Sequence, residues 1–331
     1  MGHARIAGVI AAVLLSACSA TPASAPAKSV AVTATTAPNI HVANPYGLTL
    51  DAQERVIVAD GQGKRVVRLD PKTGIGTGLA SALVFPIHVA FDSTGGMYLA
   101  DVDGYQVKKI GPSGELTPVL GTGTEGRGGA VGAPTAIDIA SVCAIAFDAK
   151  DDMVFIEAGL VRKLALATGT LTTIALGLNE PHGLTIDNDG SYLISETTAH
   201  RIVRVDPATG SITTVAGVKD QAGFAGDGGS ATAAQLNRPR QLSLDKSGAL
   251  YVADEGNGRV RKIANGTITT VAGNGSTTLA GDGGPALAAG MRGVWGVAVN
   301  SAGDLYIASP PAAAVRKVDA KTGIITTLGQ P

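Results

Sequence analysis

Short apolar runs alternate with turns rich in glycine, asparagine and aspartate along most of the chain. Within one unit, the first run closes on Asp or Asn and the second run ends in an acidic residue. The third run alternates apolar and basic residues, and the fourth is rich in threonine and valine. Residues 239–271 show the whole pattern. Four short runs separated by tight turns predict a four-stranded antiparallel meander.

Six such units align between residues 44 and 328. Their first runs close on Asp51, Asp92, Asp148, Asp187, Asp245 and Asn300. One four-stranded sheet leaves both of its faces open, whereas sheets arranged radially cover each other. The chain is therefore predicted to be all-β, a six-bladed β-propeller of four-stranded antiparallel blades. The last unit contains its own fourth run at 324–328, so the ring should close without a borrowed strand, although residues 30–35 could add one.

The repeated positions also carry a family resemblance. The pattern Pro-x-Gly-φ-x-φ-Asp, then Tyr-φ-Ala-Asp, then Asn-x-Arg-Val resembles the NHL repeat, and the fifth unit matches it best through Asn257-Gly258-Arg259-Val260. The third unit departs most, because it lacks the opening proline and ends its second run in Glu157. The resemblance implies a recognition platform, as in the extracellular sensor domains of bacterial receptor kinases.

The first forty residues lie outside the repeats. Residues 1–17 join a basic Arg5 to an apolar stretch at 6–15, which is typical of a signal peptide and too short to span a membrane. Leu15-Ser16-Ala17-Cys18 resembles the bacterial lipobox, which implies cleavage before Cys18 and diacylation of that cysteine. An ordinary secretory signal is the alternative.

Residues 18–43 are rich in Ala, Pro, Thr and Ser. They lack an apolar period, so they predict a flexible tether ahead of a propeller domain at 44–331. With the acylated Cys18, they place the protein in the cell envelope on the extracytoplasmic side, bound to membrane lipid. Ser19 after the cysteine weakly resembles the sorting pattern of outer-membrane lipoproteins.

Charge and motif content exclude several function classes. Lys and Arg number 26 and Asp and Glu 27, for a net charge of −1, so there is no electrostatic footprint for nucleic acid. No nucleotide-binding glycine loop, serine nucleophile motif or paired-cysteine metal motif is present in the sequence. The sequence favours a binding module for a protein, peptide or small molecule over an enzyme; an assembly role at the envelope is a third interpretation.

One column of the repeat is a candidate site. The residue after the opening proline should lie near the channel mouth of a propeller, and across the units it is Tyr46, Ile87, Cys143, His182, Arg240 and Trp295. A core position would repeat one residue type, whereas this column varies and holds the only tryptophan. Tyr46, His182, Arg240 and Trp295 are therefore predicted to contact a ligand. The alternative is that each packs within its own blade.

Three long inserts, at 120–141, 217–237 and 273–292, join one unit to the next. Two share Gly-Asp-Gly-Gly, around Asp227 and Asp282, and we align Arg127 of the first insert with these aspartates. The simplest interpretation is a glycine turn in which the aspartate bonds to its own backbone. Calcium binding is the alternative, although one carboxylate per loop is few for an ion that takes six to eight oxygens. Both aspartates are candidate ligand-binding residues, on the same face as the variable column.

An enzymatic function is the runner-up. The segment 181–187, with His200, resembles part of the peptide-amidating lyases, zinc-dependent six-bladed propellers in which histidines converge on zinc in the channel. Only His182 stands in the matching slot; His88 is displaced by one position, which should turn it to the other face of its strand. His41 belongs to the expected tether. No metal or other cofactor is therefore expected, and zinc-dependent lyase or lactonase- and hydrolase-like chemistry at the channel mouth is the alternative.

Overall fold

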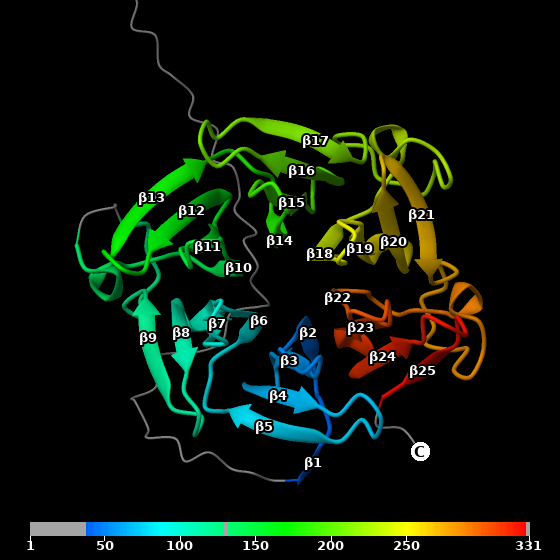
Figure 1. Ribbon diagram of the computed structural model, residues 1–331, viewed down its shortest axis with the longest axis horizontal. Coiled ribbons are helices and arrows are strands. Elements are labelled where there is room, and N and C mark those ends of the chain that lie inside the picture. Colours follow the sequence, from blue (N-terminus) through cyan, green and yellow to red (C-terminus); the bar gives the residue numbers. More distant parts are fainter. Residues whose placement is uncertain (1–37, 129–131, 329–331) are drawn as a thin grey trace, which may run out of the picture.

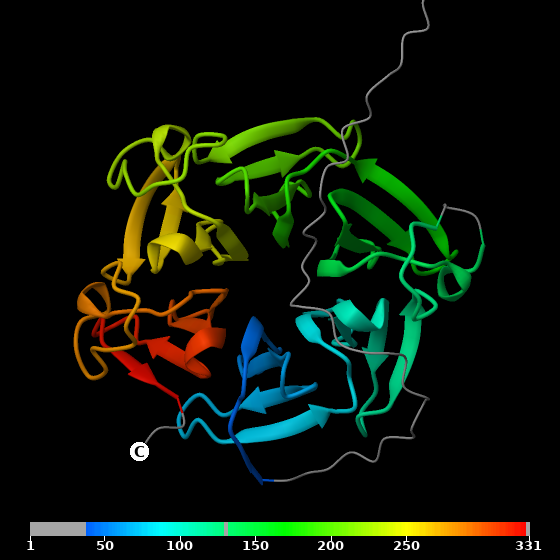
Figure 2. The ribbon, with the colours of Figure 1, turned by 180° about the vertical axis from the view of Figure 1, so that it is seen from behind.

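The computed structural model describes residues 38–128 and 132–328, so the expected signal peptide, Cys18 and most of the expected tether lie outside the described residues. Six antiparallel sheets stand around a central axis (Figures 1 and 2). The prediction of an all-β, six-bladed propeller is confirmed. Among these residues no helix is long and apolar enough to cross a membrane.

The four strands of each blade follow one another from the channel outward. Blade 1 contains β2 (Pro45–Leu50), β3 (Val56–Asp60), β4 (Arg65–Leu69) and β5 (Gly76–Ala80), and blade 2 contains β6 (Pro86–Phe91), β7 (Met97–Asp101), β8 (Gln106–Ile110) and β9 (Leu116–Leu120). Blade 3 contains β10 (Val142–Phe147), β11 (Met153–Glu157), β12 (Leu160–Ala165) and β13 (Thr170–Ala175), and blade 4 contains β14 (Pro181–Ile186), β15 (Tyr192–Glu196), β16 (Arg201–Val205) and β17 (Ile212–Ala216). Blade 5 contains β18 (Pro239–Leu244), β19 (Leu250–Asp254), β20 (Arg259–Ala264) and β21 (Thr267–Ala272), and blade 6 contains β22 (Gly296–Val299), β23 (Leu305–Ser309), β24 (Ala314–Val318) and β25 (Ile325–Thr327).

The helical elements are single 3₁₀ turns in the connections. They span Val102–Gly104, Pro134–Ala136, Ala231–Ala233, Glu255–Asn257, Ala286–Ala288 and Pro310–Ala312. Three of them, Pro134–Ala136, Ala231–Ala233 and Ala286–Ala288, lie within the three long inserts.

Blade 1 carries a fifth strand. β1 (Pro38–Ile40) pairs antiparallel with the outer strand β5, so residues within the expected tether belong to this sheet. Blade 6 supplies its own fourth strand, as the sequence predicted. Across the seam, Ser301 N donates to Glu54 Oε1 at 2.9 Å and Asn44 Nδ2 donates to Pro310 O at 3.4 Å. The first and last blades are thus joined through their own strands and turns.

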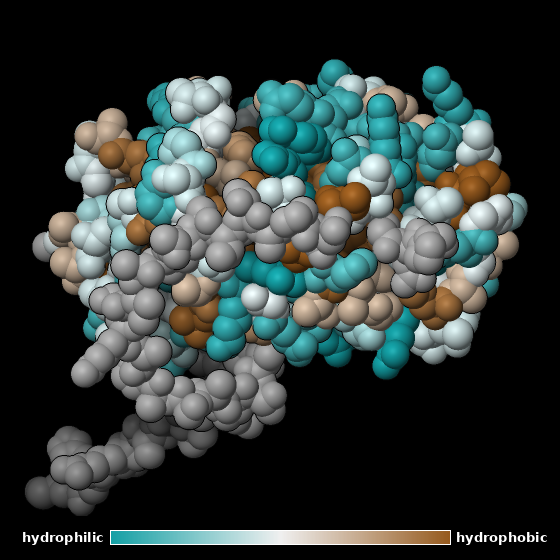
Figure 3. All heavy atoms as spheres, turned by 90° about the horizontal axis from the view of Figure 1, so that it is seen from below, coloured by the Kyte–Doolittle hydropathy of each residue, from teal (hydrophilic) through white to brown (hydrophobic). Residues whose placement is uncertain are grey.

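The hydrophobic core is divided among the interfaces between blades. One cluster joins Val154 and Ile156 of β11 to Tyr192 and Ile194 of β15, all at most 1% exposed. Each sheet therefore buries its faces against its neighbours, as the radial arrangement requires. On the side seen in Figure 3, apolar and polar residues are interspersed outside the grey atoms.

The acid at the end of the second strand links the parts of a blade. In blade 5, Asp254 Oδ1 accepts from Asn237 N at 2.8 Å, just before the inner strand, and Asp254 Oδ2 lies 3.3 Å from Arg261 Nη1 of the third strand. These charge-assisted bonds explain why the repeat couples an acid in its second run to a base in its third. The equivalent acids with the same two kinds of partner are Asp60, Asp101, Glu157 and Glu196.

Glycine at the third position of the inner strands lets neighbouring blades approach closely. A Cβ on Gly47 would lie 2.2 Å from Ile87 O, and a Cβ on Gly183 would lie 2.3 Å from Arg240 O. Both obstacles are backbone atoms of the next inner strand, so no side chain fits there. The glycine of the repeat therefore sets the packing of strands around the channel.

Candidate functional site

Trp295 lies at the centre of a cluster at one mouth of the channel. Its ring meets Tyr46 edge-to-face at 4.7 Å between centroids and His182 at 6.3 Å, and the Arg240 guanidinium stacks on its face, 4.0 Å from the ring centroid. Phe85 extends the cluster, with its ring 5.1 Å from that of Tyr46. The structure thus brings together the four side chains chosen from the variable column. We call these four residues and Phe85 the Trp295 cluster.

An irregularity at the start of three inner strands positions Tyr46, His182 and Arg240. In blade 4, Pro181 pairs with Glu196, but regular pairing resumes only at Leu184, and blades 1 and 5 share this shift. The bulge frees the second residue to turn toward the channel axis. The remaining two members of the column, Ile87 and Cys143, are buried in an apolar cluster that also contains Phe85 and packs against Tyr46.

Arg240 supplies a positive charge beneath the indole. It is only 5% exposed, and its Nε donates to Glu255 Oε2 at 2.7 Å. The same carboxylate lies 3.4 Å from Arg238 Nε. Burial lowers the Arg240 pKa, and Glu255 opposes that shift. The stacked, carboxylate-held guanidinium therefore has a fixed orientation under Trp295.

His182 presents a hydrogen-bond acceptor to this mouth. Its Nδ1 lies 3.1 Å from Glu180 O and 3.1 Å from Thr197 Oγ1, while Thr197 donates its own proton to Pro239 O at 2.8 Å. A carbonyl oxygen only accepts, so Nδ1 carries the proton. Burial, reinforced by Arg240, lowers the His182 pKa to about 3. The ring is therefore neutral at pH 7, and Nε2, which has no bonding partner in the described part of the chain, has a free lone pair.

The sequence did not single out Phe85, Glu255 or Asp103. Glu255 and Asp103 lie in the 3₁₀ turns between second and third strands. These turns follow residues that pair with the opening prolines, so their place in the repeat was the available signal. The Asp103 pKa is raised by burial and by Asp101. Phe85 immediately precedes an opening proline, a position that carries no repeated residue type.

Asp227 lies at the rim of the molecule. The 217–237 insert folds outward over the next blade (Figure 1), where Gly228 N donates to Ile268 O at 2.8 Å. Asp227 Oδ1 lies 2.7 Å from Arg261 Nη2, and Oδ2 accepts from Thr270 N at 3.1 Å. The expectation that this aspartate bonds to its own loop is therefore wrong, because its partners belong to the next blade.

Asp282 repeats this arrangement in blade 6. Its Oδ1 accepts from Arg316 Nε at 3.0 Å, and Gly283 N donates to Ile325 O at 2.8 Å. Arg261 and Arg316 are 0% and 1% exposed, so each insert supplies a carboxylate to a buried arginine. The inserts leave from the face of the Trp295 cluster, but their aspartates are not part of it.

Equivalent backbone hydrogen bonds fix the register of the first insert. Gly126 N donates to Ile139 O and Gly223 N donates to Leu236 O, each at 3.1 Å. In this register Arg127 aligns with Phe224, and the prediction that it replaces the aspartate is wrong. The position of the aspartate falls at residue 130, which is an alanine outside the described residues.

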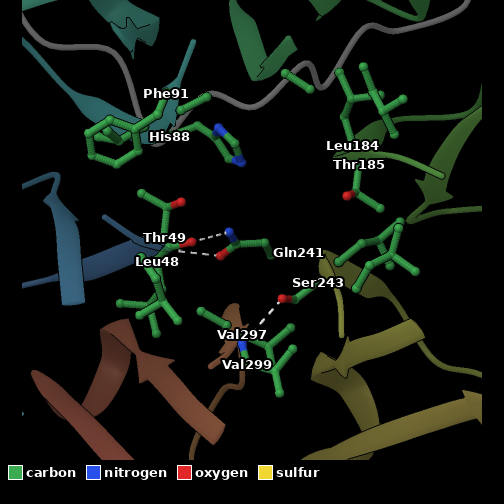
Figure 4. A pocket seen from close by; sticks show the side chains of 18 of the residues that line it. Leu48, Thr49, His88, Phe91, Leu184, Thr185, Gln241, Ser243, Val297 and Val299 are labelled. Atoms are coloured by element: carbon green, nitrogen blue, oxygen red, sulfur yellow. Dashed lines mark hydrogen bonds between the residues drawn. The ribbon is translucent and has the colours of Figure 1, made fainter. Parts of the chain in front are cut away.

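A cavity of about 540 Å³ occupies the opposite half of the channel (Figure 4). Gln241 crosses its inner end from blade 5 to blade 1, where Oε1 accepts from Leu48 N at 3.0 Å and Nε2 donates to Leu48 O at 2.5 Å. His88 lines the same end. No member of the Trp295 cluster lines this cavity, so the two ends of the channel are chemically separate.

The histidines do not converge. His182 lies in the Trp295 cluster and His88 at the cavity, while His200 Nδ1 accepts from Arg238 N at 3.1 Å in a partly exposed turn. His41 lies beside β1, where its carbonyl accepts from Arg65. Within residues 38–128 and 132–328, no three His, Cys, Asp or Glu side chains are grouped so that they could hold a metal ion.

Comparison with known proteins supports the repeat in the sequence. The model of the NHL repeat matches residues 236–263, which cover the first three strands of blade 5. The chain is 36% identical over 86 residues to SUPPRESSOR OF QUENCHING 1, chloroplastic, of Arabidopsis thaliana, covering 26% of this chain and 8% of that protein. It is 24% identical over 256 residues to Teneurin-1 of Gallus gallus, covering 65% of this chain and 9% of that protein. A probable peptidyl-alpha-hydroxyglycine alpha-amidating lyase of Caenorhabditis elegans is 33% identical over 79 residues, covering 22% of this chain and 19% of the lyase. The chain thus spans less than a tenth of the first two relatives and about a fifth of the lyase.

Both binding proteins and enzymes of known structure share the fold of this chain. An auxiliary nutrient binding protein from Bacteroides thetaiotaomicron has a TM-score of 0.67 at 16% identity, over 87% of this chain and 70% of that one. Virginiamycin B lyase from Staphylococcus aureus has a TM-score of 0.55 at 14% identity, over 89% and 88%. A gluconolactonase from Xanthomonas campestris has a TM-score of 0.59 at 15% identity, over 82% and 85%. At these identities the likeness shows the propeller fold alone.

Proposed function

We propose that this protein is an extracytoplasmic NHL-type propeller that binds a ligand at the Trp295 cluster and is held to a membrane by an acylated Cys18. The observation that carries the proposal is the convergence of three variable side chains, Tyr46, His182 and Arg240, on one tryptophan. Positions that repeat from blade to blade hold the fold together, whereas this position differs in every blade. Side chains that are free to differ and yet meet at one mouth are typical of a recognition surface.

The cluster fits a peptide or small molecule with an apolar or ring-shaped group. Trp295 and Tyr46 offer aromatic surface, and the Nε2 lone pair of His182 accepts a hydrogen bond. Arg240 holds the indole in place while sharing its charge with Glu255. A ligand with a ring and a hydrogen-bond donor would therefore satisfy the exposed groups without needing a full negative charge.

An array of peptides and glycans tests this proposal on the full chain carrying Cys18→Ser, which keeps the protein soluble after export. Trp295→Ala should weaken binding of any captured ligand by about tenfold or more, because central aromatic residues dominate such contacts. The matched control is Phe224→Ala, which removes an exposed ring stacked on Arg259 at the rim and should leave binding unchanged. Equal affinity for the parent and Trp295→Ala proteins would overturn the proposal.

The alternative is a propeller enzyme with a lyase or a lactonase- and hydrolase-like activity at the same mouth. The local similarity to the C. elegans lyase and the presence of lyases and a lactonase among proteins of this fold support it. Metal analysis separates the two: stoichiometric zinc that survives dialysis, lost in His182→Ala, would favour the lyase over the binding module.

The anchor has its own test. Cells that express the full chain are fed a fatty-acid analogue, and the protein should incorporate the label and fractionate with membranes. Cys18→Ala should abolish both properties. Label retained by the Cys18→Ala protein would refute lipidation at this residue and leave the binding proposal untouched.

A further inference from the structure

The cavity opposite the Trp295 cluster has a wall of small and hydroxyl-bearing side chains. The fifth residue of each repeat, counted from the opening proline or its equivalent, lines it, and five of these six residues are partly exposed although the channel lies inside the ring. They are Thr49, Ala90, Ala146, Thr185, Ser243 and Ala298.

A ring of larger apolar side chains surrounds the outer end of the same cavity. It consists of the last residue of each inner strand: Leu50, Phe91, Phe147, Ile186, Leu244 and Val299. We call this ring the apolar collar. Apolar surface that all six blades contribute at one opening favours the entry of a molecule with an apolar body.

His88 offers a hydrogen-bond donor at the inner end. Burial lowers its pKa to about 4, and it is 8% exposed, so it is neutral at pH 7. Its Nδ1 accepts from Ile145 N at 3.5 Å. A neutral imidazole that accepts through Nδ1 carries its proton on Nε2. Figure 4 shows the ring directed into the cavity, and no group in the described ranges accepts from Nε2.

Two further donors face the same space. Ser243 Oγ accepts from Val299 N at 3.2 Å, which leaves the hydroxyl proton for another acceptor. Gln241 uses its oxygen and one N–H on Leu48, which leaves its second N–H. The charged lining residues, Asp245 and Lys246, follow the strand and lie at the opening. The interior therefore presents uncharged donors.

We propose that this half of the channel is a second binding site, for a neutral small molecule with a carbonyl or hydroxyl oxygen on an apolar body. The oxygen accepts from His88 Nε2, and the body packs within the apolar collar. The volume of about 540 Å³ suits a small ligand. A charged ligand is disfavoured because burying a charge without a partner of opposite sign is costly. Because Gln241 separates the site from the Trp295 cluster, the two sites take different ligands.

Cyclohexanone is the probe, and the imidazole nitrogens of His88 are the reporter, followed by ¹⁵N NMR of the full chain with Cys18→Ser. Cyclohexanone should bind saturably and shift the His88 Nε2 resonance. Cyclohexanecarboxylate and cyclohexylammonium have similar shapes and should bind at least about tenfold more weakly. Methylcyclohexane should bind without moving the Nε2 resonance.

Variants separate this site from the one proposed at Trp295. His88→Phe keeps a ring and removes the donor, and should weaken cyclohexanone binding by about tenfold while leaving methylcyclohexane unchanged. Ala146→Phe fills the channel from a partly exposed wall position and should abolish binding of both probes. Trp295→Ala should have no effect. The proposal is overturned if no probe binds at millimolar concentration, if Ala146→Phe binds as the parent does, or if Trp295→Ala abolishes cyclohexanone binding.

Discussion

Removal of the two insert carboxylates should destabilise the propeller unequally. Asp227 and Asp282 each reach over the rim to a buried arginine. Arg261 has a second carboxylate, Asp254, at 3.3 Å, whereas in blade 6 the position of Asp254 is taken by Ser309. Asp227→Ala therefore leaves a paired arginine, and Asp282→Ala leaves Arg316 without any carboxylate within the described part of the chain.

The magnitudes follow from burial. Breaking a buried ion pair costs about 3–5 kcal/mol when the surviving charge has no other partner. The aspartates are 39% and 46% exposed, so solvent screens part of each interaction. We expect a loss of about 2–3 kcal/mol in the free energy of unfolding for Asp282→Ala and about 1 kcal/mol for Asp227→Ala.

Urea unfolding at pH 7, followed by circular dichroism, measures both losses. The comparison requires that the unfolding free energy falls with urea concentration at the same rate in each variant and the parent. Ser309→Asp in the Asp282→Ala background is the matched control, because it places an acid where blade 5 has Asp254, and it should recover part of the loss. Equal losses in the two single variants, or a larger loss for Asp227→Ala, would refute the reasoning that a second carboxylate compensates in blade 5.

Three further predictions concern the channel. Gln241→Leu removes both hydrogen bonds to Leu48 and leaves the N–H and C=O of Leu48 unpaired, so urea unfolding should show a loss of about 2 kcal/mol. An unchanged stability would contradict a stabilising role for Gln241. His88 and His182 have pKa values lowered to about 4 and about 3, so below about pH 6.5 the unfolded state binds more protons and stability falls as the pH decreases toward those values. ¹⁵N NMR should find both rings neutral at pH 5, and a midpoint near 6.5 for either ring would contradict its burial. Gly183→Ala would put a Cβ 2.3 Å from Arg240 O and should cost about 2 kcal/mol or more in the same unfolding assay, whereas a neutral effect would show that the inner strands can move apart.

The fold was predictable because the residues that stabilise one blade recur in the others. The opening proline, the glycine that admits the next strand and the acid that binds the third-strand base recur at fixed offsets. Blade 5 has the proline and the acid, and Gln241 stands in its glycine position. The first insert was harder to predict, because its glycines can be aligned in more than one way. The backbone hydrogen bond from Gly126 and the bridge between Glu125 and Ile139 fix the register, in which Arg127 corresponds to Phe224 and not to Asp227.

The Trp295 cluster was predictable for a related reason. All inner strands converge on one axis, so a column that varies in sequence becomes a group of neighbours in space. The cavity was missed because the two polar residues at its inner end, His88 and Gln241, occupy the third position of their inner strands, where the repeat has a glycine. His88 and Gln241 were visible there as large polar exceptions in blades on opposite sides of the ring, and that contrast was the available signal.

The chemistry of the channel is limited by strand packing. Gly47, Gly183 and Gly296 cannot carry a side chain, because a Cβ at each would lie 2.2 to 2.6 Å from a backbone oxygen of the neighbouring blade. At this position of the inner strand, only blades 2, 3 and 5 have room for a side chain. Blade 2 supplies His88 and blade 5 supplies Gln241. Gly296 also gives Gln241 its path to blade 1, since a Cβ there would meet Gln241 Oε1 at 3.0 Å. The glycines that allow the ring to close therefore also determine which blades divide the channel into two sites.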